Sequence, residues 1–250
     1  MELGLNQKVA LITGGASGLG RMTAEYMRRD GVKLVLADLN TDLLDRTAAE
    51  LRSRGGEVET VTLDVRDYEA CRAAVDHAIT SYGGVDILVN SAGIGGEVQF
   101  FADSDPSDWM DLIDINFRGV ANCCRAVTDH MREKRYGKIV SLASEAGRAN
   151  EKRMVLYGAT KGGVISLTRG LALELGRYQI TVNAVCPGVT KTPMTPWIDD
   201  EMEQHADRFY PLGRFGRPED IAPMITFLSS DEASWITGQA ISISGGFGRS

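Results

Sequence analysis

Short apolar runs alternate with longer amphipathic segments along almost the whole chain. Seven runs are rich in Val, Ile and Leu at successive positions, which is typical of parallel strands buried on both faces. These expected strands are Lys8–Thr13, Lys33–Ala37, Val58–Leu63, Val85–Asn90, Lys138–Ala143, Thr181–Cys186 and Ala240–Ser244. Expected helices between them are Leu19–Arg29, Thr41–Arg54, Tyr68–Tyr82, Ser107–Lys134, Met154–Arg177 and Pro218–Ser229. Regular alternation predicts an α/β fold, a doubly wound sheet of about seven parallel strands flanked by helices.

The alternation is interrupted at one place, near the end of the chain. No Pro/Ser-rich linker, low-complexity stretch or internal repeat divides residues 1–250, so we expect a single domain. Thr190–Arg217 departs from the rhythm with several prolines, Trp197 and an acidic patch. An insertion of this kind near the carboxyl edge of a sheet is a candidate substrate lid, at about residues 190–217.

Composition and charge exclude several classes of protein. The 250 residues are 43% hydrophobic and 24% charged, which rules out a disordered chain. The formal net charge of −7 makes a general nucleic-acid or anionic-membrane binder improbable, so the expected partner is a small molecule. We expect no membrane span and no secretory signal. The four cysteines form no CxxC pair and the three histidines are scattered, which predicts a cytoplasmic protein with free thiols and no metal.

A glycine-rich turn follows the first expected strand. It runs from Thr13 to Gly20, with glycines at 14, 15, 18 and 20, and leads into a helix. Backbone N–H groups of such a loop, together with a helix N-terminus, can bind a pyrophosphate, as in Rossmann-type dinucleotide sites. The spacing differs from GxGxxG, and a tight turn without a ligand is the alternative interpretation.

The second expected strand leads to Asp38. A carboxylate there can accept hydrogen bonds from the adenosine ribose hydroxyls, whereas a 2′-phosphate would face a like charge. No basic residue lies between Gly14 and Gly20, and Leu39 follows Asp38. We therefore expect NAD rather than NADP as the cofactor. The alternative is that Asp38 only caps the strand end.

Tyr157 and Lys161 are four residues apart, which places both on one face of a helix. A nearby ammonium favours the phenolate and would lower the pKa of Tyr157. Tyr157 could then accept the proton of an alcohol as hydride leaves, or donate it in the reverse direction. Ser144 follows a strand end and could hydrogen-bond the substrate oxygen.

Six motifs in this order resemble the short-chain dehydrogenase/reductase family, in its branch of about 250 residues. The resemblance covers almost the whole chain. It rests on the glycine loop, Asn90-Ser91-Ala92-Gly93, Asn116, Ser144 with Tyr157 and Lys161, Pro187-Gly188 with Thr192, and Trp235–Gln239 with Gly245-Gly246. Two residues depart from the pattern: Ser91 replaces the second Asn of NNAG, and Ser244 stands where the family often has Asp. The latter could alter the C-terminal edge.

The resemblance implies a set of site residues. The catalytic residues would be Asn116, Ser144, Tyr157 and Lys161, with Lys161 also binding the nicotinamide ribose and Asn116 holding a water. The implied cofactor-binding residues are Gly14, Ser17, Gly18, Leu19, Gly20, Asp38, Leu39, Asp64, Val65, Asn90, Ala92, Gly93, Tyr157, Lys161, Pro187, Gly188, Val189 and Thr192. In this family the two long helices pack between subunits, so we expect a homotetramer.

The expected function is NAD-dependent interconversion of a secondary alcohol and its ketone, on a cyclic or aromatic substrate or a hydroxyacyl thioester. One alternative is a 3-oxoacyl-thioester reductase, a role that usually goes with NADPH. Another is a non-catalytic dinucleotide-binding regulatory protein. We expect three loops to shape the pocket: Ile94–Asp103, Glu145–Val155 and Thr190–Leu212. Arg148, Lys152 and Arg153 either steer a carboxylate or the phosphates of a thioester into it, or are solvated surface charges.

Overall fold

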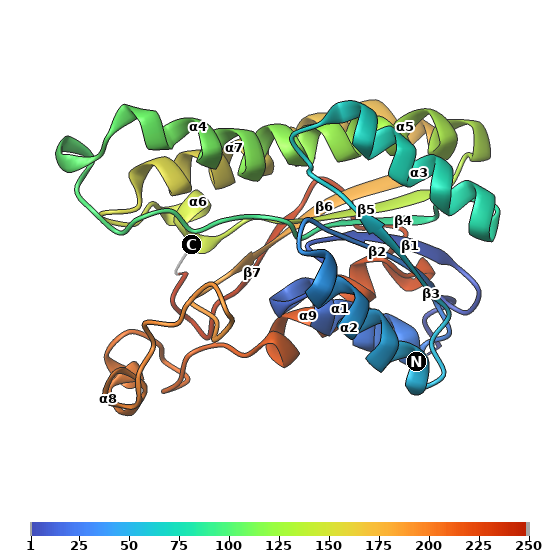
Figure 1. The fold of residues 1–250 in the computed structure, drawn as a ribbon. Helices are drawn as coiled ribbons and strands as arrows, with labels where there is room; N and C mark the ends of the chain where they lie inside the picture. The colour runs from blue at the N-terminus through green and yellow to red at the C-terminus, as the bar shows by residue number, and fades with distance from the viewer. Residues whose placement is uncertain (1, 249–250) are drawn as a thin grey trace.

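A seven-stranded, all-parallel sheet forms the centre of the computed structural model, which describes residues 2–248 (Figure 1). The strand order is β3-β2-β1-β4-β5-β6-β7. The strands are β1 (Val9–Thr13), β2 (Lys33–Asp38), β3 (Val58–Thr62), β4 (Ile87–Asn90), β5 (Gly137–Leu142), β6 (Ile180–Pro187) and β7 (Ala240–Ile243). Because the order reverses between β1 and β4, a crevice opens at the carboxyl ends of these two strands. The predicted doubly wound fold is confirmed.

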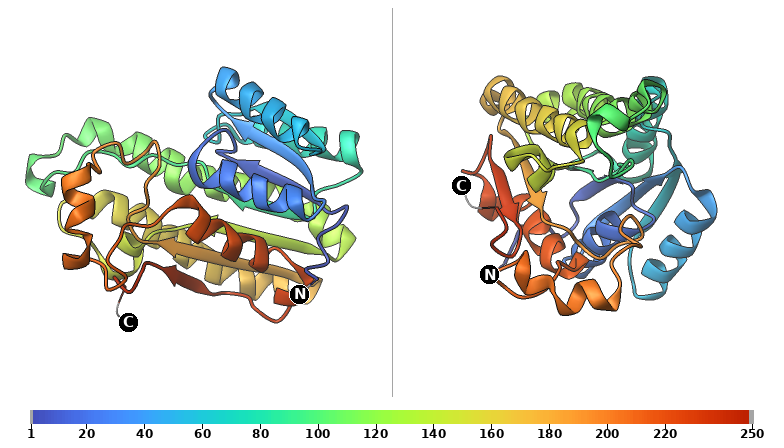
Figure 2. Two further views of the ribbon diagram at one scale, coloured as in Figure 1. Left: turned by 90° about the horizontal axis from the view of Figure 1, so that it is seen from below. Right: turned by 90° about the vertical axis from the view of Figure 1, so that its left-hand side faces the viewer.

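Helices cover both faces of the sheet (Figures 1 and 2). One face carries α1 (Gly18–Arg29), α2 (Thr41–Ser53) and α9 (Pro218–Leu228), and the other carries α3 (Tyr68–Tyr82), α5 (Gly119–Lys134) and α7 (Val155–Leu175). Three shorter helices are α4 (Trp109–Ile113), α6 (Glu145–Ala149) and α8 (Asp200–Gln204). Within residues 2–248, no helix is both long enough and apolar enough to cross a membrane.

The core is divided by the sheet into two apolar layers. In β1, Leu11 packs in the layer under α3, α5 and α7, whereas Ala10 and Ile12 pack in the layer under α1 and α9. Successive side chains of a strand point to opposite faces, so a strand buried on both sides needs apolar residues at consecutive positions. This explains why a central strand such as β1 or β4 is predicted from a run of apolar residues at consecutive positions.

The middle helix differs from its prediction. One continuous helix was expected over Ser107–Lys134, but a π-helical turn at Asp114–Arg118 separates α4 from α5, and a 3₁₀ turn precedes α4. The prediction of a single regular helix is therefore wrong. A π turn accommodates an extra residue per turn, changes the direction of nearby side chains, and frequently occurs at functional sites. Asn116 lies within this turn and is fully buried.

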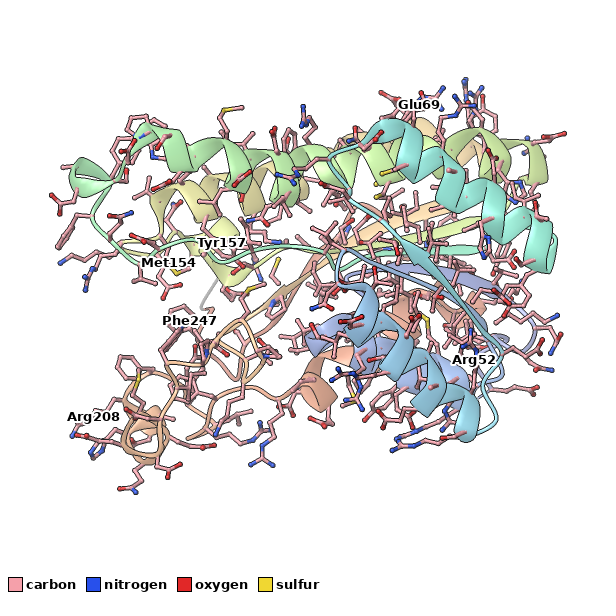
Figure 3. All side chains as sticks on the ribbon, in the orientation of Figure 1. Arg52, Glu69, Met154, Tyr157, Arg208 and Phe247 are labelled. Atoms are coloured by element: carbon pink, nitrogen blue, oxygen red, sulfur yellow. The ribbon has the colours of Figure 1, made fainter. Side chains whose placement is uncertain are left out.

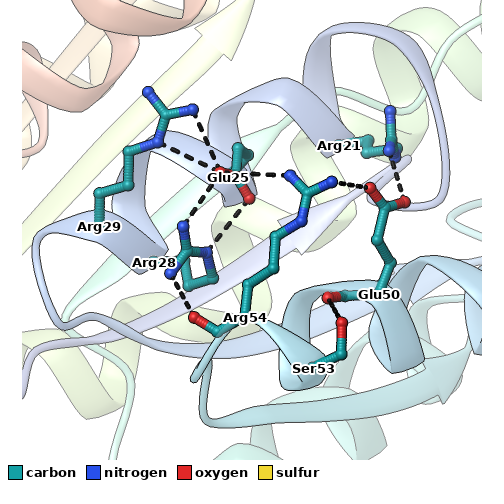
Figure 4. A network of polar contacts seen from close by, with 7 residues as sticks. All are labelled: Arg21, Glu25, Arg28, Arg29, Glu50, Ser53 and Arg54. Atoms are coloured by element: carbon teal, nitrogen blue, oxygen red, sulfur yellow. Dashed lines mark hydrogen bonds and ion pairs between the residues drawn. The ribbon is translucent and has the colours of Figure 1, made fainter.

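An ion-pair network joins α1 to α2 and the turn after it (Figure 4). Arg28 donates two hydrogen bonds to the buried carboxylate of Glu25 and holds its pKa below the usual value. Glu50 accepts from Arg21 at 2.5 Å and from Arg54 at 2.8 Å. The network fixes the helix that begins at the glycine loop. It also pairs Arg21 with the carboxylate of Glu50.

Candidate active site

A cavity of about 500 Å³ lies at the carboxyl ends of the strands and extends from Asp38 to Phe247. Most of the residues predicted from the sequence line it. These are Gly14, Ser17, Gly18, Leu19, Asp38, Leu39, Asp64, Val65, Ala92, Gly93, Ser144, Tyr157, Lys161, Pro187, Gly188, Val189 and Thr192. Three predicted residues, Gly20, Asn90 and Asn116, lie behind this lining.

The glycine loop is shaped by close backbone approach. Gly14 has a φ of 63°, and a Cβ there would lie 2.8 Å from the backbone nitrogen of Ala92. A Cβ on Gly20 would overlap the carbonyl oxygen of Gly14, so Gly20 lets the helix pack against the loop rather than touching a ligand. Ser17 is the N-cap of α1, but its side chain makes no capping hydrogen bond. The Ser17 hydroxyl and the first turn of α1 thus border the cavity with unused donors.

Asp38 both caps the loop and borders the cavity. Its Oδ2 accepts from the backbone nitrogen of Ala16 at 3.1 Å, and its Oδ1 accepts from that of Asn40 at 3.0 Å. A carboxylate has about four acceptor positions, so two remain for a ligand. Arg66 also borders the cavity, but it is bound to Asp64 through contacts of 2.8–3.0 Å that hold the pKa of Asp64 below its usual value.

Three functional side chains meet where β5 ends and α7 begins. Ser144 follows β5 and caps α6, its Oγ accepting from the backbone nitrogen of Ala146 at 3.1 Å. Tyr157 lies in the first turn of α7. Lys161, one turn later, is only 5% exposed, and its Nζ donates to the carbonyl oxygen of Leu142 at 2.9 Å. The Lys161 Nζ lies 5.7 Å from the centre of the Tyr157 ring.

The electrostatics of this group differ from the expectation. Burial raises the pKa of Tyr157, a hydrogen bond with Ser144 opposes that rise, and the negative charge of Glu151 adds to it. Burial lowers the pKa of Lys161 to about 8. The expectation that Lys161 depresses the pKa of Tyr157 is not met, because the ammonium is desolvated and bonded to a backbone carbonyl.

Two buried amides have structural contacts. Asn116 holds Ile94 at both ends of its amide: Oδ1 accepts from the Ile94 nitrogen and Nδ2 donates to the Ile94 oxygen, each at 2.8 Å. Its predicted role of holding a water stays a prediction. Asn90 donates to Ser141 Oγ at 3.0 Å, so its side chain bridges β4 and β5 in the core. Only the residues that follow Asn90 in the chain reach the cavity, so the sequence placed the strand end correctly but not this side chain.

At the end of the cavity away from Asp38, the wall is mostly apolar and also contains charged and polar side chains. Met154, Met194 and Trp197 line the cavity, whereas Val155 and Phe209 are exposed and outside it. Glu145, Glu151 and Tyr210 also line the cavity and belong to two of the three loops expected to shape it. Figure 3 shows Met154 and Tyr157 on one side and Phe247 on the other. Phe247 lies outside all three loops, and no pattern in the sequence indicates it.

The three basic residues of the second loop do not act as one group. Arg148 points inward, with Nη1 3.5 Å from Oε1 of the buried Glu145. Lys152 and Arg153 both lie over the ring of Phe100, each 5.3 Å from its centre. These contacts join the second substrate loop to the first.

This combination of a switch-point crevice, a glycine cradle and a Tyr–Lys pair defines an oxidoreductase that uses a nicotinamide dinucleotide. A family profile described as enoyl-(acyl carrier protein) reductase matches residues 14–248. The chain belongs to the short-chain dehydrogenase/reductase family.

Several relatives extend over nearly the whole chain. The chain is 38% identical to the 3-oxoacyl-[acyl-carrier-protein] reductase FabG of Thermotoga maritima, over 97% of this chain and 98% of that protein. It is 37% identical to the (2S)-[(R)-hydroxy(phenyl)methyl]succinyl-CoA dehydrogenase subunit BbsD of Thauera aromatica, over 98% of each chain. Among solved structures, gox2181 superposes with a TM-score of 0.94 at 32% identity, over 98% of this chain and 97% of that one.

Proposed function

We propose that the protein interconverts a secondary alcohol and its ketone, with NAD as the preferred cofactor. The observation that carries this proposal is one cavity bordered by Asp38 and the glycine loop at one end and by Ser144, Tyr157 and Lys161 at the other. A dinucleotide that spans this cavity would bring its reactive ring to the Tyr–Lys pair.

The residues present fit such a cofactor. A Cβ at Gly18, where φ is 51°, would lie 3.7 Å from the Cβ of Thr192, so a larger side chain would fill the space between the glycine loop and the segment after β6. The unbonded Ser17 hydroxyl and the N-terminus of α1 suit a pyrophosphate. The carboxylate of Asp38 suits ribose hydroxyls, and the cations near it, Arg21 and Arg66, are already paired with acids.

When bound, the nicotinamide supplies the hydride acceptor or donor. The Oη of Tyr157 would take the alcohol proton during oxidation and return it during reduction. Ser144 would donate a hydrogen bond to the substrate oxygen as charge develops there. Lys161, with its pKa of about 8, keeps its charge at neutral pH, where it would bind the nicotinamide ribose and favour the phenolate once the site is occupied.

A second candidate is reduction of a 3-oxoacyl thioester with NADPH. The similarity to FabG of Thermotoga maritima favours this reaction, and the similarity to BbsD favours a hydroxyacyl thioester as substrate. The carboxylate of Asp38 at the ribose end argues for the NAD-dependent reaction instead.

The proposal also covers the location, the lid and the assembly of the protein. We place the enzyme in the cytoplasm, since the four cysteines are buried free thiols. Thr190–Arg217 would act as the substrate lid of a single-domain subunit. A homotetramer would cover apolar side chains that are unusually exposed, Leu173 on α7 at 87% and Trp235 before β7 at 98%.

One experiment separates the two candidates. Initial rates are measured with NAD or NADP on linear, cyclic and aromatic secondary alcohols and on a 3-hydroxyacyl thioester. Turnover of free alcohols with NAD supports the proposal. Turnover of the thioester alone, with NADP alone, would establish the reductase candidate.

A further inference from the structure

Glu151 stands out at the substrate end of the cavity. It is half-buried and lines the cavity, and its carboxyl has no hydrogen bond or ion pair with another side chain in the part of the chain that the structure describes. Glu145, the other acid in this wall, differs because it lies beside Arg148. Burial raises the pKa of Glu151. A carboxyl removed from water without a partner is unfavourable, and a ligand that donates to it would relieve that cost.

The loop that carries Glu151 is held in a conformation that non-glycine residues rarely adopt. Asn150 has a φ of 61° and Arg153 a φ of 71°. Such backbone is strained and persists only where the surroundings impose it. The carbonyl oxygen of Arg153 accepts from the backbone nitrogen of Gln99 at 3.0 Å, and Phe100 lies beneath Lys152 and Arg153.

In this loop the two basic side chains contact Phe100, while the acidic side chain of Glu151 lines the cavity. The Lys152 ammonium and the Arg153 guanidinium lie against the face of Phe100. Lys152 also borders the cavity. The Glu151 carboxyl faces the same cavity, whose wall includes the apolar side chains of Ile94, Met154 and Met194. The loop therefore presents to the substrate the Glu151 carboxyl, which has neither a hydrogen bond nor an ion pair with a described side chain, whereas Oε1 of Glu145 lies beside Arg148.

We propose that Glu151 is a specificity-determining residue that accepts a hydrogen bond from a second group of the substrate, a hydroxyl or an ammonium near the reacting carbinol. The inference rests on the proposed function and names its substrate class. Alcohols that carry such a donor are favoured, and alcohols that carry a carboxylate at that position meet a like charge.

The test uses a matched series built on cyclohexanol. The substituent at the neighbouring carbon is a hydroxyl, a methoxy, an ammonium or a carboxylate group, and kcat/KM is measured with NAD. The wild type should prefer the diol to its methyl ether by about tenfold, because a site built to bond a hydroxyl leaves its own acceptor unpaired with the ether. The ammonium compound should exceed the carboxylate by a larger factor.

Two substitutions separate hydrogen bonding from charge. Glu151→Leu removes the acceptor and should abolish the preference for the diol over the ether. Glu151→Gln keeps an acceptor and should retain part of that preference while losing the ammonium-over-carboxylate discrimination. Glu97→Gln is the control, because Glu97 is an exposed acid of the neighbouring loop that does not line the cavity. It should leave both ratios unchanged.

Equal rates for the diol and the ether in the wild type would overturn the inference, and so would a diol preference that survives in Glu151→Leu. If no compound of the series is oxidised, cyclohexanol included, the proposed function fails for this substrate type. In that case the affinity of the protein for each compound is measured instead, from the change in fluorescence of Trp197, which lines the cavity. Tighter binding of trans-1,2-cyclohexanediol than of its methyl ether supports the inference, and equal binding or none by either contradicts it.

Discussion

The two ends of the cavity are built in different ways. The cofactor end consists of strand ends and glycines: Gly14 brings its backbone against Ala92, and the Thr13 hydroxyl accepts from the backbone nitrogens of Ser91 and Ala92 at 3.2 and 3.3 Å. The substrate end consists of side chains from three loops, the first two of which contact each other at Phe100. A site formed by backbone follows from the topology of the sheet, whereas a site formed by loop side chains depends on contacts that no local pattern reveals.

The largest effect should come from the residue that joins the two ends. Tyr157→Phe removes the only atom proposed to exchange the alcohol proton, so kcat should fall by about 10²–10⁴-fold. Binding of NADH, followed by its fluorescence, should persist because the glycine loop is untouched. Turnover at the wild-type rate in this variant would remove Tyr157 from the mechanism and leave the substrate end without a proton acceptor.

The backbone character of the cofactor end is tested by Gly20→Ala. The added Cβ would overlap the carbonyl oxygen of Gly14, which is backbone and cannot rotate away, so the free energy of unfolding should fall by about 2 kcal/mol. Urea denaturation measures this change. Gly176→Ala is the control, because its φ is −54° and nothing lies within 4 Å of the added Cβ. Equal stability of both variants would show that the loop is more adaptable than its packing indicates.

Burial of the Lys161 ammonium at the substrate end should lower the free energy of unfolding. Its pKa in the folded state is about 8, below the usual lysine value of 10.5, so the unfolded chain binds more protons between these values and stability rises with pH there. Lys161→Met should be more stable than the wild type at pH 7, by at most about 3 kcal/mol. The difference should shrink as pH rises from about 8 to 10.5. A variant less stable than the wild type at pH 7 would mean that the bond to Leu142 outweighs desolvation.

The smallest effect is expected at Asp38. Asp38→Ala should reduce the preference for NAD over NADP by about tenfold, which corresponds to about 1.4 kcal/mol, because a like charge near the 2′-phosphate is removed. The ratio of kcat/KM values for the two cofactors measures it. Asp38→Asn separates charge from capping, since the amide oxygen can still accept from Ala16. An unchanged ratio in a folded Asp38→Ala variant would reduce Asp38 to a strand-end cap.

The same contrast explains what the sequence could predict. All seven strands were located to within two residues at either end. In β1 and β4, burial on both faces leaves a continuous apolar run, and polar or turn residues mark where such a run ends. The bounds of α3, Tyr68–Tyr82, were predicted correctly. Asp67 caps its first turn, and Gly83, with a φ of 87°, ends it.

Other features had no local signal. The π turn at Asp114–Arg118, α6 and α8 are five residues each, which is too short to establish a period in the sequence. The pKa of Tyr157 was misjudged because the direction in which Lys161 donates depends on the position of the Leu142 carbonyl in β5. The loop Glu145–Val155 was predicted to shape the pocket, but which of its side chains face the cavity, Glu151 among them, depends on the fold.

The most direct test of the central claim is to follow the hydride itself. A secondary alcohol that the wild type oxidises is prepared with deuterium on the carbinol carbon and incubated with NAD. The account predicts that one deuterium appears in the reduced nicotinamide ring for each ketone formed, and that Tyr157→Phe forms neither product at a comparable rate. Ketone formation without deuterium in the nicotinamide would contradict direct transfer between substrate and cofactor in this cavity.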